Sequence, residues 1–286
     1  MARVIGGVGT SHVPALGMAI DKGTTQAPQW KPIFDGYERA REWVREVCPD
    51  VVIVVYNDHG SAVSLDMLPT FAIGVAAEYK PADEGWGPRS VPAVAGDVEL
   101  SWHLAESLIN EQFDMTVCQR LDVDHGLTVP LSILWGPCEA WPVRVVPIAV
   151  NVIQYPLPSP ARCYALGQAL RRAISSWEPE LNVLLAGTGG MSHQLQGARA
   201  GLINTKFDKM FLEKIATDPR SLSDMSITDY IREAGSEGAE LIMWLIMRGA
   251  LGDAVDVVHS DYHVPASNTA AGIVVLQEFK DRDQHF

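Results

Sequence analysis

The sequence predicts an α/β fold: a single domain with a central, mostly parallel or mixed sheet flanked by helices. Short runs rich in β-branched residues alternate along the chain with longer stretches of helical spacing, which is typical of strands joined by crossover helices. The 286 residues contain one long Pro- and Gly-rich stretch, residues 80–96, and no clear second linker. We therefore expect one domain over residues 1–286.

The expected strands are short apolar runs in which Val and Ile recur and which end at polar or turn-forming residues. The run VVIVVY, residues 51–56, is apolar throughout, as expected for a buried strand. In chain order, the strands are expected at residues 2–8, 51–56, 71–76, 116–120, 144–149, 183–186 and 272–276.

The expected helices are longer segments with apolar residues at helical spacing, some bounded by start and stop signals. Ser159 and Pro160 form a start signal for one of them, and Gly249 is a stop signal for the last. The helices are expected at residues 33–47, 98–112, 160–177, 205–217 and 236–248.

Composition excludes several classes of function. The net charge is -13, from 22 basic and 35 acidic residues, and no basic cluster is present, so a nucleic acid partner is not expected. No apolar run reaches the roughly 18 residues of a membrane span, and no secretory signal precedes residue 12. The expected location is the cytoplasm. The 4 cysteines form no C-x-x-C pair, so any metal is expected to have nitrogen and oxygen ligands.

Residues 80–96 form neither a helix nor a central strand, because Pro and Gly are too frequent there. A loop of this length in a compact domain is usually functional or lies at an interface. An ordered surface loop without a role is the alternative, and the sequence leaves both open.

Four histidines follow the ends of apolar runs: His12, His59, His125 and His193. The carboxyl ends of parallel strands meet at one edge of a sheet, where ligands usually bind. A lone histidine after a strand is more often a hydrogen-bonded structural residue, but four in equivalent positions predict a metal or acid/base site. Asn57 and Asp58, beside His59, could orient ligands or a substrate, but turn formation is the better explanation for these two residues taken alone.

Glu240 is the candidate carboxylate ligand. On the expected helix 236–248 it shares a face with Met243, Trp244 and Met247, and a carboxylate in an apolar stripe needs a cationic partner. Glu237 is explained by its position at the helix start. Two histidines and one carboxylate suit non-haem Fe(II) in oxygenases, while Zn²⁺ in a hydrolase is the competing chemistry. Spacing does not separate the two.

Long strings of this sequence resemble the catalytic β subunits of protocatechuate 4,5-dioxygenases, a family of class III extradiol ring-cleavage enzymes. The resemblance covers essentially the whole chain. It rests on NDH (57–59), PADEGWGPR (81–89), DVDHGLTVPLS (122–132), GTGGMSHQLQG (187–197), RAGLIN (199–204), GSEGAELIMWLIMRGAL (235–251) and HVPASNTA (263–270).

The resemblance implies a role for each candidate. His12, His59 and Glu240 would hold one Fe(II), His193 would be the catalytic acid/base, and His125 would be a second catalytic histidine that contacts a substrate hydroxyl or bound oxygen. The ordinary pKa of a histidine lies close to neutrality, which suits a group that takes and returns a proton.

The resemblance also implies a substrate. Protocatechuate would be cleaved at its 4,5 bond with O2 to give 4-carboxy-2-hydroxymuconate semialdehyde. Ser267, Asn268 and Thr269 would contact the ring carboxylate or a hydroxyl, although a turn rich in Ser and Asn is the alternative. Gallate or 3-O-methylgallate is the second substrate candidate. A binding relative without catalysis and a zinc hydrolase are the remaining alternatives.

Members of this family pair the catalytic chain with a smaller helical α subunit that covers the active site, commonly as α2β2. The present sequence ends at Phe286, shortly after its last expected strand. The expectation is therefore a separate α chain, or a substitute from another protomer of a homo-oligomer.

Overall fold

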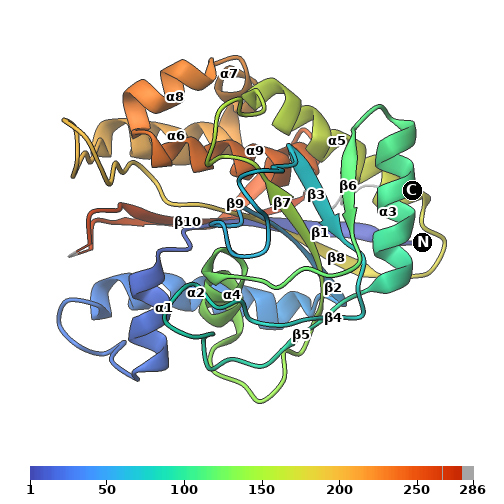
Figure 1. Ribbon diagram of the computed structural model, residues 1–286, viewed down its shortest axis with the longest axis horizontal. Helices are drawn as coiled ribbons and strands as arrows, with labels where there is room; N and C mark the ends of the chain where they lie inside the picture. Colours follow the sequence, from blue (N-terminus) through green and yellow to red (C-terminus); the bar gives the residue numbers. More distant parts are fainter. Residues whose placement is uncertain (266, 279–286) are drawn as a thin grey trace, which may run out of the picture.

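The structure, a computed structural model, describes residues 1–265 and 267–278; the stretch up to Phe286 at the end of the sequence lies outside the described residues. An eight-stranded mixed sheet runs through the molecule with helices on both faces (Figure 1). Its strand order is β6-β3-β7-β2-β8-β1-β10-β9. The predicted α/β fold with a central mixed sheet is confirmed.

Four neighbouring strands in the middle of the sheet are parallel: β7 (Arg144–Val150), β2 (Val51–Tyr56), β8 (Asn182–Thr188) and β1 (Arg3–Thr10). Antiparallel pairing joins β3 (Phe71–Gly74) to β7, β10 (Ala271–Glu278) to β1, and β9 (Val255–His263) to β10. The edge strand β6 (Met115–Cys118) is parallel to β3, and a separate small sheet pairs β4 (Glu78–Tyr79) with β5 (Val94–Ala95).

Helices cover the two faces of the sheet in separate layers (Figure 1). One layer contains α1 (Pro14–Asp21), α2 (Lys31–Val47) and α4 (His125–Trp135). The other contains α3 (Val98–Asn110), α5 (Pro160–Ser176), α6 (Thr205–Thr217), α7 (Pro219–Ser223), α8 (Ile227–Ala234), the 3-10 turn η1 (Glu237–Glu240) and α9 (Leu241–Gly249).

Strand β2 shows why the sheet needs both layers. Its side chains alternate between two apolar clusters: Val51, Ile53 and Val55 join the cluster under α5 and α9, while Val52 and Val54 join the one under α2 and α4. Successive side chains of a strand point to opposite faces, so a strand between two layers must be apolar at every position.

The predicted strands lie within a few residues of β1, β2, β3, β6, β7, β8 and β10, and the expected helix 205–217 coincides with α6. The cap of α5 is also confirmed, because Ser159 accepts a hydrogen bond from the backbone of Arg162 at 3.2 Å. Helix α4 was not predicted, since it is buried from His125 to Leu134 and has no amphipathic pattern. Strand β9 was missed because it is a half-exposed edge strand rich in polar residues.

The expected helix 236–248 is wrong in its first turn. Residues Glu237–Glu240 form the 3-10 turn η1, and the α-helix begins only at Leu241. Every residue of α9 is buried, so the helix has no apolar stripe for Glu240 to interrupt. Glu240 instead lies at the junction of the two helices.

Small residues let α9 pack directly on the sheet. A Cβ atom at Gly9 would lie 2.2 Å from Cε3 of Trp244, and one at Gly187 would lie 2.8 Å from Cα of the same residue. Only glycine allows this approach of helix and strand. The packing brings the start of α9, and therefore Glu240, to the carboxyl ends of β1 and β8.

Among the described residues, no helix combines the length and the apolar character that crossing a membrane requires.

Candidate active site

Three of the predicted histidines follow neighbouring parallel strands at one edge of the sheet. His12 follows β1 by two residues, His59 follows β2 by three, and His193 follows β8 by five. The sequence prediction that these strand ends meet is confirmed. His125 reaches the same place differently, as the first residue of α4, so its assignment to a strand end is wrong. Asp124 caps this helix by accepting a hydrogen bond from the backbone of Gly126 at 2.8 Å.

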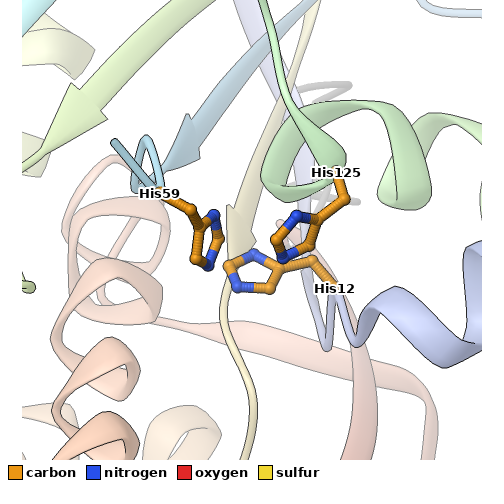
Figure 2. Close-up of side chains that lie close together, drawn as sticks. All are labelled: His12, His59 and His125. Carbon is orange, nitrogen blue, oxygen red and sulfur yellow. The ribbon is translucent and has the colours of Figure 1, made fainter. Parts of the chain in front are cut away.

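The rings of His12, His59 and His125 converge (Figure 2). The ring centroids lie 5.2 Å apart for His12 and His59, 5.6 Å for His12 and His125, and 3.9 Å for His59 and His125. One ring nitrogen from each histidine lies within 4.8 Å of the other two. Three imidazoles this close can share one cation.

Hydrogen bonds fix which nitrogen of each ring faces the centre. The Thr188 hydroxyl donates to the carbonyl of Gly126 at 3.2 Å, so its oxygen accepts from Nδ1 of His12 at 3.0 Å. Nδ1 of His59 donates to the Asp124 carboxylate at 2.9 Å. Nδ1 of His125 donates to the Glu84 carboxylate. In the neutral form of each ring the proton is therefore on Nδ1, and Nε2 is the atom that can bind a metal.

Glu240 completes the group. Its Oε2 lies 3.3 Å from Nε2 of His12, and its Oε1 lies 3.9 Å from Nε2 of His59. Oε2 also accepts a hydrogen bond from the backbone of Gly190 at 2.6 Å. Nε2 of His12 is fully buried and has no hydrogen-bond partner among the described residues, which is costly for a polar atom. Together, the Nε2 atoms of His12 and His59 and the Glu240 carboxylate form a set of ligands that fits a divalent metal ion.

The charges in the group are strongly coupled. Burial lowers the pKa of His12. Burial also disfavours the charged forms of His59, Asp124 and Glu240, but their mutual hydrogen bonds and charges reverse this effect. The pKa of His59 is raised to about 10, that of Asp124 is lowered, and that of Glu240 is held well below its ordinary value by His12 and His59. Both acids are therefore carboxylates near neutral pH.

His193 lies beside this cluster. Its Nδ1 donates to the carbonyl of Met191 at 2.8 Å, which leaves Nε2 as a proton acceptor. The ring packs on Gly190, where a Cβ atom would lie 2.7 Å from Cε1 of His193, and the same Gly190 donates to Glu240. The neighbouring Ser192 is fixed by the buried Asp208, which accepts from its backbone and its hydroxyl.

The candidate substrate residues are placed differently from one another. Thr269 pairs with His193 in an isolated antiparallel bridge, and its side chain lies against Gly190. Asn57 is buried, and its Nδ2 lies 3.1 Å from Nε2 of His59. Ser267 is half-buried and Asn268 is exposed, and no contact among the described residues joins either side chain to the histidines.

Asp58 has the turn-forming role that the sequence suggested. Its carboxylate accepts hydrogen bonds from the backbone of residues 60–63 and from the hydroxyl of Ser61. These bonds hold the loop after β2 and thereby place His59. Glu84, Asp124 and Thr188 were not identified from the sequence. Each forms a hydrogen bond with a histidine that is distant in the chain, and these contacts form only on folding.

Similarity to known proteins extends over most of the chain. The chain matches the family described as "Catalytic LigB subunit of aromatic ring-opening dioxygenase" over residues 6–273. A gallate dioxygenase of Pseudomonas putida is 44% identical over 71% of this chain and 58% of its own length. A 2,3-dihydroxyphenylpropionate/2,3-dihydroxicinnamic acid 1,2-dioxygenase of Rhodococcus is 33% identical over 64% of this chain and 54% of its own length. The chain thus matches little more than half of these two relatives.

Two further matches extend over most of the chain. A relative from Xanthobacter autotrophicus with the same printed name as the Rhodococcus protein is 26% identical over 93% of this chain and 96% of its own length. Among solved structures, an uncharacterized protein from Escherichia coli K12 has a TM-score of 0.56 at 12% identity and covers 95% of this chain and 99% of its own. This last likeness concerns the fold alone.

Proposed function

Because the chain belongs to the LigB family of aromatic ring-opening dioxygenases, we propose that it cleaves the ring of a dihydroxybenzoate beside its diol, using O2 and Fe(II). The observation that carries the proposal is the buried Nε2 of His12, which lies 3.3 Å from Glu240 and has no hydrogen-bond partner in the described part of the chain. The catalytic unit is the single domain over residues 1–286.

His12, His59 and Glu240 would hold the metal. When bound, Fe(II) supplies open coordination positions for a catecholic diol and for O2. The protonated Nδ1 atoms of His12 and His59 keep both rings in the tautomer that a ligand needs. Nδ2 of Asn57 lies 3.1 Å from Nε2 of His59, so its amide would lie beside a substrate bound at this site.

His193 and His125 would handle protons and hydrogen bonds. Nε2 of His193 is free to accept the phenolic proton of the substrate, because Nδ1 is bound to the Met191 carbonyl. Nε2 of His125 would bond a substrate hydroxyl or oxygen. Thr269, paired with His193, is the best placed of the residues proposed to contact the ring substituents. Ser267 and Asn268 are the further candidates, on the strength of the resemblance.

Protocatechuate is the proposed substrate, on the strength of the sequence strings. The 44% identity to a gallate dioxygenase favours gallate as the second candidate, since the two acids differ by one ring hydroxyl. The third candidate is 3-O-methylgallate. A zinc hydrolase with the same ligands is the alternative chemistry.

A partner chain over the site is part of the proposal. Large apolar side chains are exposed in three loops at the edge of the sheet that carries the histidines: Met67 after β2, Trp86 after β4 and Tyr155 after β7 are 82%, 78% and 81% exposed. These side chains are the exposed apolar surface that a partner at this edge would contact. A smaller α subunit, in an α2β2 assembly, or a second protomer would cover them.

The test is O2 uptake by the chain after anaerobic loading with Fe(II), with protocatechuate, gallate and 3-O-methylgallate compared by catalytic efficiency. We expect O2 consumption together with a yellow ring-opened semialdehyde. Iron-loaded protein that consumes no O2 with any of the three acids, alone or with a candidate α subunit, contradicts the proposal. Activity with zinc on an ester under anaerobic conditions would favour the hydrolase.

A further inference from the structure

The loop of residues 80–96 places the carboxylate of Glu84 against His125, the histidine at the start of α4. Oε1 of Glu84 accepts a hydrogen bond from the backbone of His125 at 3.0 Å, and Oε2 accepts a short hydrogen bond from Nδ1 of the same residue. Both side chains are nearly buried, at 10% and 9% exposed. Both carboxylate oxygens of Glu84 therefore accept hydrogen bonds from His125.

The loop is fixed where it approaches His125. The backbone of Ala82 donates to Val123 at 2.9 Å, and Val123 donates back to Lys80 at 2.8 Å. The Asp83 carboxylate accepts from the backbone of Gly85 at 2.9 Å and of Gly87 at 2.8 Å, which closes the turn around Glu84. Glu84 is thus held in position rather than left on a free surface loop.

Farther along, Arg89 ties the loop to two helices. It forms an ion pair with Asp21 of α1 at 2.7 Å and donates to the Thr128 hydroxyl of α4 at 3.1 Å. The sequence left open whether residues 80–96 are functional or an idle surface loop. These contacts favour a function, because the loop is anchored on the same helix that carries His125.

The carboxylates around His125 already accept hydrogen bonds from N–H groups. Glu84 and Asp124 lie close enough to His125 to suggest a separate cation site. However, Asp124 accepts from the backbone and Nδ1 of His59 and from the backbone of Gly126. Glu84 accepts both of its bonds from His125. Carboxylates used in this way orient a histidine more effectively than they bind an additional ion.

We propose that Glu84 is a positioning residue that acts through His125, by fixing the ring and keeping a proton on Nδ1 so that Nε2 faces the reacting groups. Figure 2 shows the His125 ring turned toward His12 and His59. A carboxylate can only accept a hydrogen bond, so Nδ1 must be the protonated atom. The catalytic consequence rests on the proposed function, whereas the position of the proton does not.

The proton is tested first, by NMR of the metal-free full chain with 15N-labelled histidine, with His125 assigned through the H125Q variant. The wild type is expected to show a protonated Nδ1 in His125, and E84A is expected to show a mixture of the two ring tautomers. E78A is the matched control, since Glu78 is an exposed glutamate in β4, just before the loop, and it should leave the His125 signals unchanged. An unprotonated Nδ1 in the wild type, or the same tautomer change in E78A, overturns the proposal.

Kinetics then test the consequence. E84Q is expected to lower kcat about 10- to 100-fold with normal iron content and a KM within about threefold of wild type, as is typical for the partner of a functional histidine. E84D should restore part of kcat. In an H125A background, E84Q should cost less than about twofold, because the two residues act as one unit.

An additive effect of E84Q in the H125A background, or equal losses of kcat in E84Q and the control E78Q, overturns the positioning role. A wild type that is inactive with every catechol overturns the proposed function instead, and the tautomer measurement then decides the role of Glu84 by itself.

Discussion

Removal of the Glu240 carboxylate is the sharpest test of the metal site. Glu240 is the only anion that lies within 4 Å of both His12 and His59 Nε2 atoms among the described residues. E240Q keeps the size of the side chain and an oxygen that can accept from Gly190, so it removes the charge and little else. E237Q is the matched control, because Glu237 lies one turn away, is half-exposed, and bonds to Ser236 and Leu195 rather than to a histidine.

The expected magnitude follows from these contacts. Loss of a residue that only orients a ligand typically costs 10- to 100-fold in metal affinity, so loss of the ligand itself should cost about 100-fold or more. That factor corresponds to about 2.8 kcal/mol. E240A also leaves the buried N–H of Gly190 without an acceptor and should destabilise the metal-free fold by about 1 to 3 kcal/mol, whereas E240Q should not.

The assay is iron retained per chain after anaerobic desalting, with a Kd from competition with a chelator and a Tm for each metal-free variant. E237Q should match the wild type in all three measurements. If E240Q keeps one iron per chain with a Kd within about threefold of wild type, the ligand assignment is wrong. The cluster of His12, His59 and His125 would then be the metal site.

Three further predictions follow from the site and its support. H193N should lower kcat about 10²- to 10⁴-fold while iron content stays normal, as expected for loss of an acid/base group, and a variant that keeps its kcat would exclude that role. The pKa of Asp124 is lowered on folding: burial opposes the shift, but the hydrogen bond and charge of His59 prevail. Its contribution to stability is therefore present above the unfolded pKa of about 4 and lost as pH falls further. In the metal-free protein, the Tm of D124N should fall less than that of wild type between about pH 5 and pH 2, and parallel curves would contradict this. G9A should cost about 1 to 3 kcal/mol of stability and weaken iron binding, because its Cβ would lie 2.2 Å from Trp244 and displace α9 with Glu240; unfolding by urea and iron content measure both effects.

The parts of the fold that could be predicted are those whose burial is visible in a short window of sequence. Strand β2 contacts helices on both faces, so its residues are apolar throughout and it was predicted to the residue. Helix α4 is just as buried, but a helix that is apolar all round has no period, and the segment was missed. The edge strand β9 was missed for the opposite reason, since its half-exposed residues carry little apolar signal.

The residues of the candidate site also differ in whether a local sequence pattern could identify them. His12, His59 and His193 could be found because each follows an apolar run that becomes a parallel strand, and parallel strands end at one edge. Glu240 was identified through an expected helix face that does not exist. Its burial comes instead from the junction of η1 and α9 and from the close packing of Trp244 on Gly9.

By itself, the sequence determined the α/β class, the central strands and the residue types of the candidate site, because these depend on local patterns of burial and on chemistry that each residue carries with it. Only the tertiary structure decided which nitrogen of each histidine faces the centre. Three hydrogen bonds fix that choice: His12 with Thr188, His59 with Asp124, and His125 with Glu84. The partners are 176, 65 and 41 residues apart in the sequence. No local pattern records such contacts, since they form only when the strands and α4 pack together.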